Sequence, residues 1–285
     1  MFRYFLFFLI FFASNKLKAT HLIGGEMNYS FTGGDVYDIS LSVYRDCYLG
    51  QAEYDVPAYI LVYDGEGAYL GYFSVDGEPE VRLPVEIDDE CYTAPLNVCV
   101  EKKLYNLSVN LPANVSGYYL SYQRCCRNNS ILNIYDDVVN SVVASGMNLF
   151  TFIPPLEQLE NNNPVFNEYP PVAICVNKPF YFDHSATDSD GDSLVYKLCT
   201  PTDALTDVRP IYYPNQNNQD PIPFKEVRWR NPYSLNNMLG GTAPLKIDSK
   251  TGILTALPIT IGQFVVGVCV DEYRSGEYIA QTRRD

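Results

Sequence analysis

Apolar and polar residues alternate along much of this chain, which is the pattern of β-strands with one buried face. Over residues 36–47 the side that carries Cys47 is mostly apolar, whereas the opposite side carries Asp38, Ser40 and Ser42. Comparable runs are separated by Gly, Pro, Asn and Asp, which are typical of turns. We therefore expect strands over these segments: 36–47, 58–63, 69–75, 104–111, 118–127, 173–176, 180–183, 193–198 and 262–270. Residues 245–254 are expected to form a strand, a tight turn and a second strand, and 138–152 to complete the first half.

Composition and charge narrow the class of protein further. The 285 residues include 24 Tyr, 15 Phe, 19 Pro and 18 Gly, a balance that favours an all-β fold. With 34 acidic and 20 basic residues the formal charge is -14, so phosphate backbones should repel the chain and nucleic acid is excluded as an expected partner. An acidic surface also suits the binding of cations outside the cell.

The sequence divides into four segments. Residues 1–19 combine a basic start with an apolar run over 4–13, which is too short for the roughly 20 residues of a membrane-spanning helix and predicts a secretory signal peptide. A first β-sandwich module is expected over 20–153 and a second over 172–285. Five prolines and the triplet 161–163 (Asn-Asn-Asn) mark 154–171 as a linker. Because the sequence stops directly after a strand, we expect the second module to be truncated and the chain to continue into further domains.

Eight cysteines in a secreted chain favour disulfides, and no C-x-x-C pair points to a metal site. Cys91 and Cys99 bracket a short loop that one bridge could close. Cys47 and Cys126 each lie on the apolar face of a predicted strand, and we pair them. Cys175 and Cys269 lie in the first and last strands of the second module, and we pair these as well. This leaves Cys125 with Cys199 across the modules, one pattern among 105 possible connectivities.

The stretch 187–194 (Thr-Asp-Ser-Asp-Gly-Asp-Ser-Leu) carries the strongest candidate chemistry. Asp188, Asp190 and Asp192 alternate around a glycine just before a strand, and calcium takes six to eight oxygen ligands. A solvated turn explains the same residues, since Asp and Gly are ordinary turn formers. The helix–loop–helix calcium pattern does not fit, because the positions that it reserves for Gly and Glu hold Ser193 and Cys199. Any calcium here is expected on a β-scaffold.

The second module resembles a cadherin-like, dystroglycan-type immunoglobulin-like domain over about 172–272. The resemblance rests on D-x-D-G-D-x-L-x-Y-x-L at 188–198, L-K-I-D at 245–248, T-G-I-L at 251–254, Pro258 and G-Q-F-V-V at 262–266. It implies that calcium could be held by acidic residues of the turn and of the last strand: Asp188, Asp190, Asp192, and Asp271 or Glu272. Three cysteines and a long insertion over 201–241 depart from the pattern.

The whole chain is also similar to the amino-terminal part of large surface proteins of gliding Bacteroidetes. The matching stretches are T-H-L-I-G-G-E at 20–26, Y-R-D-C at 44–47, Y-Q-R-C-C-R-N at 122–128 and V-D-E-Y-R at 270–274. The similarity implies a secreted, multi-domain protein.

No enzyme signature is present. His184 lies between Asp183 and Ser185, but neighbours on a strand point apart and cannot form a Ser-His-Asp triad. His21 stands near the mature amino terminus as a possible terminal metal ligand. The many carboxylates do not single out a glycosidase pair.

Aromatic residues of the insertion offer a second class of function. Tyr212, Tyr213, Trp229 and Tyr233 lie among amides and acids, as in secreted sugar-binding modules. Alternatively, Trp229 anchors the insertion onto the sandwich.

Two functions are therefore expected. The first is a non-catalytic, calcium-stiffened module of a secreted or cell-surface adhesin, which contacts an extracellular protein or glycan surface. The alternative is a carbohydrate-binding or accessory portion of a secreted hydrolase.

Overall fold

The computed structural model describes residues 22–48, 53–84, 98–125, 127–128, 130–135, 137–139, 142–155, 160–204, 222–241 and 243–285. Within these residues every regular element is a β-strand, which confirms the predicted all-β class. No helix in this part of the chain is long and apolar enough to cross a membrane. The predicted signal peptide lies outside the described residues, as does His21.

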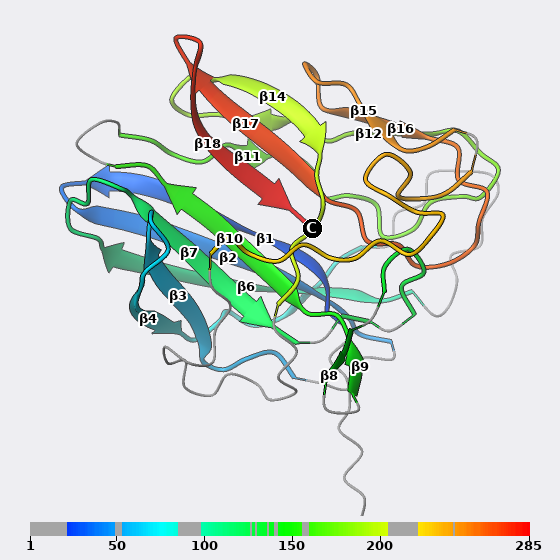
Figure 1. The fold of residues 1–285 in the computed structure, drawn as a ribbon, viewed down its shortest axis with the longest axis horizontal. Coiled ribbons are helices and arrows are strands. Elements are labelled where there is room, and N and C mark those ends of the chain that lie inside the picture. The colour runs from blue at the N-terminus through cyan, green and yellow to red at the C-terminus, as the bar shows by residue number, and fades with distance from the viewer. Residues whose placement is uncertain are drawn as a thin grey trace, which may run out of the picture.

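Two sheets form a sandwich around the larger core (Figure 1). The seven-stranded sheet has the order β14 (Ser193–Leu198), β17 (Val268–Arg274), β18 (Glu277–Arg284), β1 (Leu22–Gly33), β2 (Val36–Asp46), β6 (Val100–Asn110), β5 (Val81–Arg82). The four-stranded sheet has the order β10 (Met147–Ile153), β7 (Tyr118–Arg124), β3 (Ala58–Asp64), β4 (Tyr69–Val75).

The alternation in the sequence explains this packing. In β2 the apolar positions Ile39, Leu41 and Val43 are buried, and they meet Ile60 and Leu120 of the other sheet in one cluster. Burying these side chains removes apolar surface from water, which is the main term that stabilises the sandwich.

Smaller sheets complete the carboxy-terminal half. They are β12 (Phe180–Asp183), β16 (Ile253–Ala256) and β15 (Lys246–Ile247) in one sheet, β11 (Val165–Phe166) with β13 (Ala186–Thr187), and β8 (Asp137–Val139) with β9 (Val142–Ala144). A second apolar cluster, which includes Tyr196, Leu245, Leu254 and Val270, joins β11, β12, β15 and β16 to β14 and β17 at the end of the seven-stranded sheet.

The seven-stranded sheet joins strands from both predicted modules. Antiparallel β1 and β18 pair with Glu26 opposite Arg284, although the two residues are at opposite ends of the sequence. Part of the predicted linker is packed, since Asn161, Asn163 and Phe166 are buried. The division into modules at 153 and 172, and their immunoglobulin-like character, stay predictions.

All four predicted disulfide pairs are wrong. Cys47 is bonded to Cys99, and Cys199 to Cys269. These bonds exclude the predicted pairs Cys47–Cys126, Cys91–Cys99, Cys175–Cys269 and Cys125–Cys199.

Strand pairing explains both bonds. Cys47 and Cys99 flank the register pair Asp46–Val100 of β2 and β6, so the bridge closes two neighbouring strands of one sheet. Cys199 extends β14 beside β17, which contains Cys269. Our prediction paired Cys47 with Cys126 by their apolar faces, Cys91 with Cys99 across a loop, and Cys175 with Cys269 as strand neighbours, and so did not include the strand pairs that the structure contains. Cys125 and Cys175 are also disulfide-bonded, whereas Cys91 and Cys126 lie outside the described residues.

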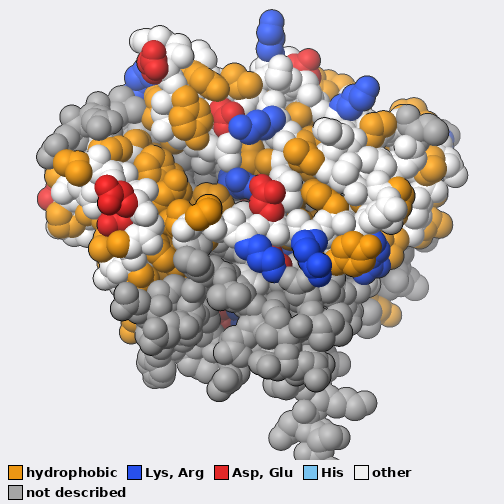
Figure 2. Space-filling view, viewed as in Figure 1, with side chains coloured by type: hydrophobic (Ala, Val, Ile, Leu, Met, Phe, Trp, Pro, Cys, Tyr) orange, Lys and Arg blue, Asp and Glu red, His pale blue; other side chains and the backbone are white. Residues whose placement is uncertain are grey.

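Charge is unevenly distributed over the surface. On the face shown in Figure 2, several Lys and Arg side chains lie near the middle, although the chain as a whole is acidic.

Candidate functional site

The acidic turn leads from β13 into β14 and is held by its first aspartate. Oδ1 of Asp188 accepts hydrogen bonds from the backbone N–H groups of Asp190 (3.0 Å) and Asp192 (2.8 Å). Gly191 has a φ of 81°, a left-handed conformation that glycine adopts without steric cost. The Asp188 side chain therefore stabilises the turn through local hydrogen bonds, as it would in an ordinary Asp-Gly turn.

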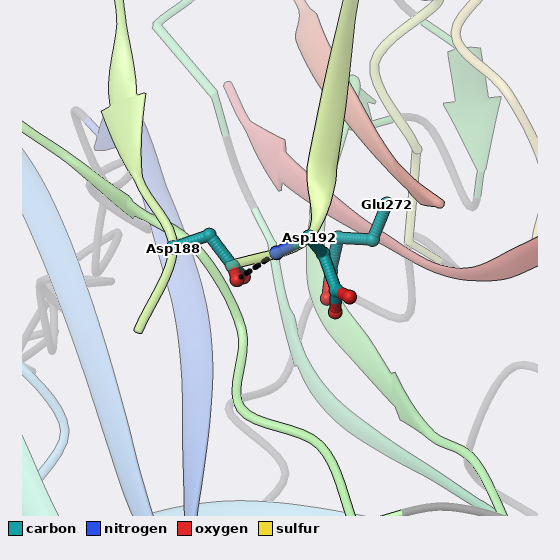
Figure 3. Close-up of side chains that lie close together, drawn as sticks. All are labelled: Asp188, Asp192 and Glu272. Carbon is teal, nitrogen blue, oxygen red and sulfur yellow. Dashed lines mark hydrogen bonds between the residues drawn. The ribbon is translucent and has the colours of Figure 1, made fainter. Parts of the chain in front are cut away.

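Three carboxylates converge beside this turn. Each of Asp188, Asp192 and Glu272 offers an oxygen, and these oxygens lie within 4.8 Å of one another. Figure 3 shows the Asp192 and Glu272 carboxylates side by side, with Asp188 bonded to the backbone nitrogen of Asp192. The β14–β17 ladder creates this contact, because Leu194 pairs with Glu272 and brings β17 against the end of the turn.

The other two predicted ligands have different partners. Asp190 accepts hydrogen bonds from the backbone N–H (2.7 Å) and side-chain amide (2.6 Å) of Asn162. Asp271 accepts hydrogen bonds from Lys197 (2.5 Å) and Gln281 (2.6 Å). Since successive side chains on a strand face opposite sides, β17 brings Glu272 to the turn and directs Asp271 away from it.

Glu272 is the most buried member of the cluster. Its side chain is fully shielded, and Asn161 Nδ2 donates a hydrogen bond to its Oε2 at 2.8 Å. Burial raises the pKa of Glu272 to about 7, against the lowering effect of the amide hydrogen bonds. Burial also raises the pKa of Asp188, whose Oδ2 is buried with no hydrogen-bond partner among the described residues.

Arg274 supplies a resident positive charge. Its Nε and Nη2 lie 2.7 Å from the two carboxylate oxygens of Asp192, and Nη1 donates to the carbonyl of Glu160 at 3.0 Å. This two-pronged geometry is the strong form of an arginine–carboxylate pair. Arg274 also lies 3.3 Å from Asp190, so one guanidinium pairs with two of the acidic residues in this region, and the cluster keeps a net negative charge.

The triplet Asn161–Asn163, which we predicted as linker, connects the cluster to the sandwich. Asn161 Nδ2 donates to the hydroxyl of Tyr29 (3.0 Å) as well as to Glu272. Asn163 Oδ1 accepts hydrogen bonds from the backbone of Tyr29 (3.1 Å).

The remaining contacts of the triplet reach β1 and β10. Asn162 Oδ1 accepts from the backbone of Phe31 (2.8 Å), and Asn163 Oδ1 also accepts from the hydroxyl of Thr151 (2.8 Å). Sequence reasoning missed this role because consecutive amides are equally typical of loops; the signal available was the large Phe166 and Tyr169 in the same segment.

The donor set suits a hard divalent cation. All the converging groups are carboxylate oxygens, which calcium prefers, and the orphaned Oδ2 of Asp188 has the capacity to accept one more partner. Asp188, Asp192 and Glu272 are therefore the residues that would hold the predicted ion, and Asp192 would have to exchange part of its pairing with Arg274 for it.

The predicted aromatic site is only partly described. Trp229 is half-buried and packs against the cluster of Ile131, Ile134 and Val265, and the ring of Tyr233 lies 5.8 Å from that of Phe264. Tyr212 and Tyr213 lie outside the described residues.

The contacts of His184 do not form a triad. The ring lies against Phe166, while Ser185 Oγ accepts a hydrogen bond from Asn167 at 3.0 Å. Asp183 accepts from the backbone of Ser185 and not from the imidazole.

Comparison with known proteins adds no relative to this description: no family model, no curated protein and no solved structure matches the chain.

Proposed function

We propose that this protein is a non-catalytic extracellular surface module, part of an adhesin, in which calcium stiffens the connection between the acidic turn and the sandwich. The observation that carries the proposal is the convergence of Asp188, Asp192 and Glu272 beside a turn that is hydrogen-bonded to the 161–163 segment. The two described disulfides and the resemblance to secreted surface proteins support an extracellular location.

The mechanism is mechanical. A cation held by Asp188, Asp192 and Glu272 would link the turn before β14 to β17, and Asn161 would extend that link to Tyr29 of β1. Like charges that are crowded together repel, so neutralising them stabilises the folded arrangement. A ligand that binds only the folded state stabilises that state. Once the ligand concentration exceeds Kd, the stabilisation grows with the logarithm of the ratio of ligand concentration to Kd.

Thermal melting of the secreted protein in calcium and in chelator tests this function. We expect Tm to rise with millimolar calcium, and the rise to disappear in Asp188→Asn and in Glu272→Gln. Asp271→Asn is the matched control, because it removes a carboxylate from the same strand on the opposite face. An unchanged Tm in wild type at millimolar calcium would remove the ion from the proposal, and a shift that survives both site variants would place the ion elsewhere.

Adhesion is tested separately, by binding of the protein to extracellular protein and glycan surfaces with and without calcium. Loss of binding in chelator, restored by calcium, is the result expected of a calcium-stiffened adhesin. The packing of Trp229 into an apolar cluster does not favour the carbohydrate-binding alternative, which stays a prediction of the sequence.

A further inference from the structure

His184 is a buried titratable residue that the proposed function does not use. It lies between β12 and β13 with 3% of its surface exposed. Both ring nitrogens are buried, and neither has a hydrogen-bond partner among the described residues. A neutral imidazole tolerates this surrounding at some cost, but an imidazolium would carry two unsatisfied N–H donors and a charge.

The His184 ring packs at tilted angles, 55° and 62°, against the rings of Phe166 and Phe182. We refer to these three rings together as the stack, and it ends on a cation. The centroid of the His184 ring lies 4.7 Å from that of Phe166 and 5.6 Å from that of Phe182. Beyond Phe166 comes Arg284, whose guanidinium carbon is 4.1 Å from the Phe166 centroid. A proton on His184 would therefore add a second positive charge to a buried stack that already contains one.

The groups around the stack do not compensate such a charge. Glu26 is engaged by Arg284 through two hydrogen bonds. Asp183 is solvent-exposed and accepts a hydrogen bond from the backbone of Ser185. The Tyr196 hydroxyl accepts a hydrogen bond from the backbone of Ala186. Burial, reinforced by the charge of Arg284, lowers the pKa of His184 to about 3, against the smaller raising effect of Asp183.

Phe166 also ties this stack to the rest of the molecule. It sits in β11, where it pairs with Ala186 of β13, two residues after His184. Asn167 N donates to Ser185 O at 3.0 Å. The same segment, a few residues earlier, contains the asparagine triplet. An imidazole that must leave the stack in order to be protonated would separate β11 from β13.

We propose that His184 is an acid-sensitive latch: its protonation opens the β11–β13 contact and loosens the 160–168 segment from the carboxy-terminal half. This is a regulatory device of the fold and does not depend on calcium. Acid opens the latch because of proton linkage. In the open state His184 has an ordinary histidine pKa near 6.5 and binds the proton that the closed state rejects. The opening equilibrium constant should therefore rise by up to tenfold for each pH unit below about 6.5 until the latch is mostly open.

Hydrogen exchange in chelator measures this opening at single amides. We expect the protection of the Asn167 amide, corrected for the intrinsic rate, to fall by about tenfold between pH 6 and pH 5, while the amides of β2 keep theirs. His184→Phe, which keeps an aromatic ring and has no titrating group, should abolish this pH dependence. Phe182→Leu is the control that loosens the stack and retains the pH dependence.

Two results would overturn the latch. One is an equal pH dependence of Asn167 protection in wild type and in His184→Phe. The other is an imidazole resonance of His184, identified by its absence in His184→Phe, that titrates near pH 6.5 while Asn167 stays protected. If His184→Phe does not fold, His184→Leu replaces it in both experiments.

Discussion

Glu26 and Arg284 form a buried, two-pronged ion pair between the first and last strands of the described chain. Arg284 Nε lies 2.7 Å from Glu26 Oε2, and Nη2 lies 3.1 Å from Oε1. Both residues are at least nine-tenths buried, and they are register partners in the β1–β18 pair. The pair therefore locks together two ends of the sequence that no local pattern connects.

Breaking this pair from one side should be costly. Glu26→Gln leaves the Arg284 guanidinium buried and uncompensated, so we expect the free energy of unfolding to fall by about 3–5 kcal/mol. Urea denaturation measures the change. Lys197→Gln, which removes the half-exposed partner of Asp271, should cost less than about 1 kcal/mol. Equal costs for the two variants would mean that burial does not govern the strength of these pairs.

The asparagine triplet should contribute to stability, although its composition is typical of loops. Asn163→Ala leaves the backbone N–H of Tyr29 and the hydroxyl of Thr151 without their buried acceptor, which should cost about 1–3 kcal/mol. Asn110→Ala, at an exposed position at the end of β6, should change the free energy of unfolding by less than about 0.5 kcal/mol. Equal stability of Asn163→Ala and wild type in urea would show that water replaces the lost contacts.

The disulfides should be visible in both peptide mapping and stability. Proteolysis without reductant should release peptides that join Cys47 to Cys99 and Cys199 to Cys269. These bridges span 52 and 70 residues, and chain entropy alone predicts about 4 kcal/mol for each. Replacing both cysteines of one bridge by Ser should lower the free energy of unfolding by about 2–5 kcal/mol. Recovery of a Cys91–Cys99 peptide would contradict the strand pairing described here.

Glu272 should make stability in chelator depend on pH with a sign opposite to that of His184. Its pKa of about 7 in the folded protein lies above the ordinary value of 4.5, so the folded state binds more protons between these values. The stabilising contribution is complete below pH 4.5 and is lost as the pH rises through 7, a loss of about 3 kcal/mol. Glu272→Gln should flatten this slope in urea denaturation measured from pH 4.5 to 7.5. If Glu272→Gln leaves the dependence of the free energy of unfolding on pH unchanged, that dependence comes from other groups.

Much of the fold follows from periodicity. Strands were predicted at β2, β3, β4, β7 and β14: β2, β4 and β14 show a period of two, whereas β3 is a short apolar run that ends at a Gly-rich turn. β1 was not predicted, and β18 was expected only as a strand without stated bounds at the end of the sequence. Their sequences mix buried glycine, glutamate and arginine on the inner positions, and these residues become compatible with burial only through the pairing of Glu26 with Arg284.

The candidate site was predicted in part for a similar reason. The turn at Asp188–Asp192 is local, so its residues could be identified from their spacing. Glu272 was predicted only as an alternative to Asp271, and strand orientation separated the two. Arg274 and Asn161 reached the cluster through tertiary contacts that have no spacing rule.

By itself, the sequence determined the all-β class, the position of the main strands and the acidic turn, because these depend on interactions between residues that are close along the chain. Tertiary structure alone decided the disulfide pairing, the union of both halves in one seven-stranded sheet, and the partners of each carboxylate. Those features depend on which strands become neighbours and on how they are aligned. That alignment is set by the burial of apolar faces throughout the molecule, and a one-residue shift in register would turn Glu272 away from the turn and Asp271 toward it.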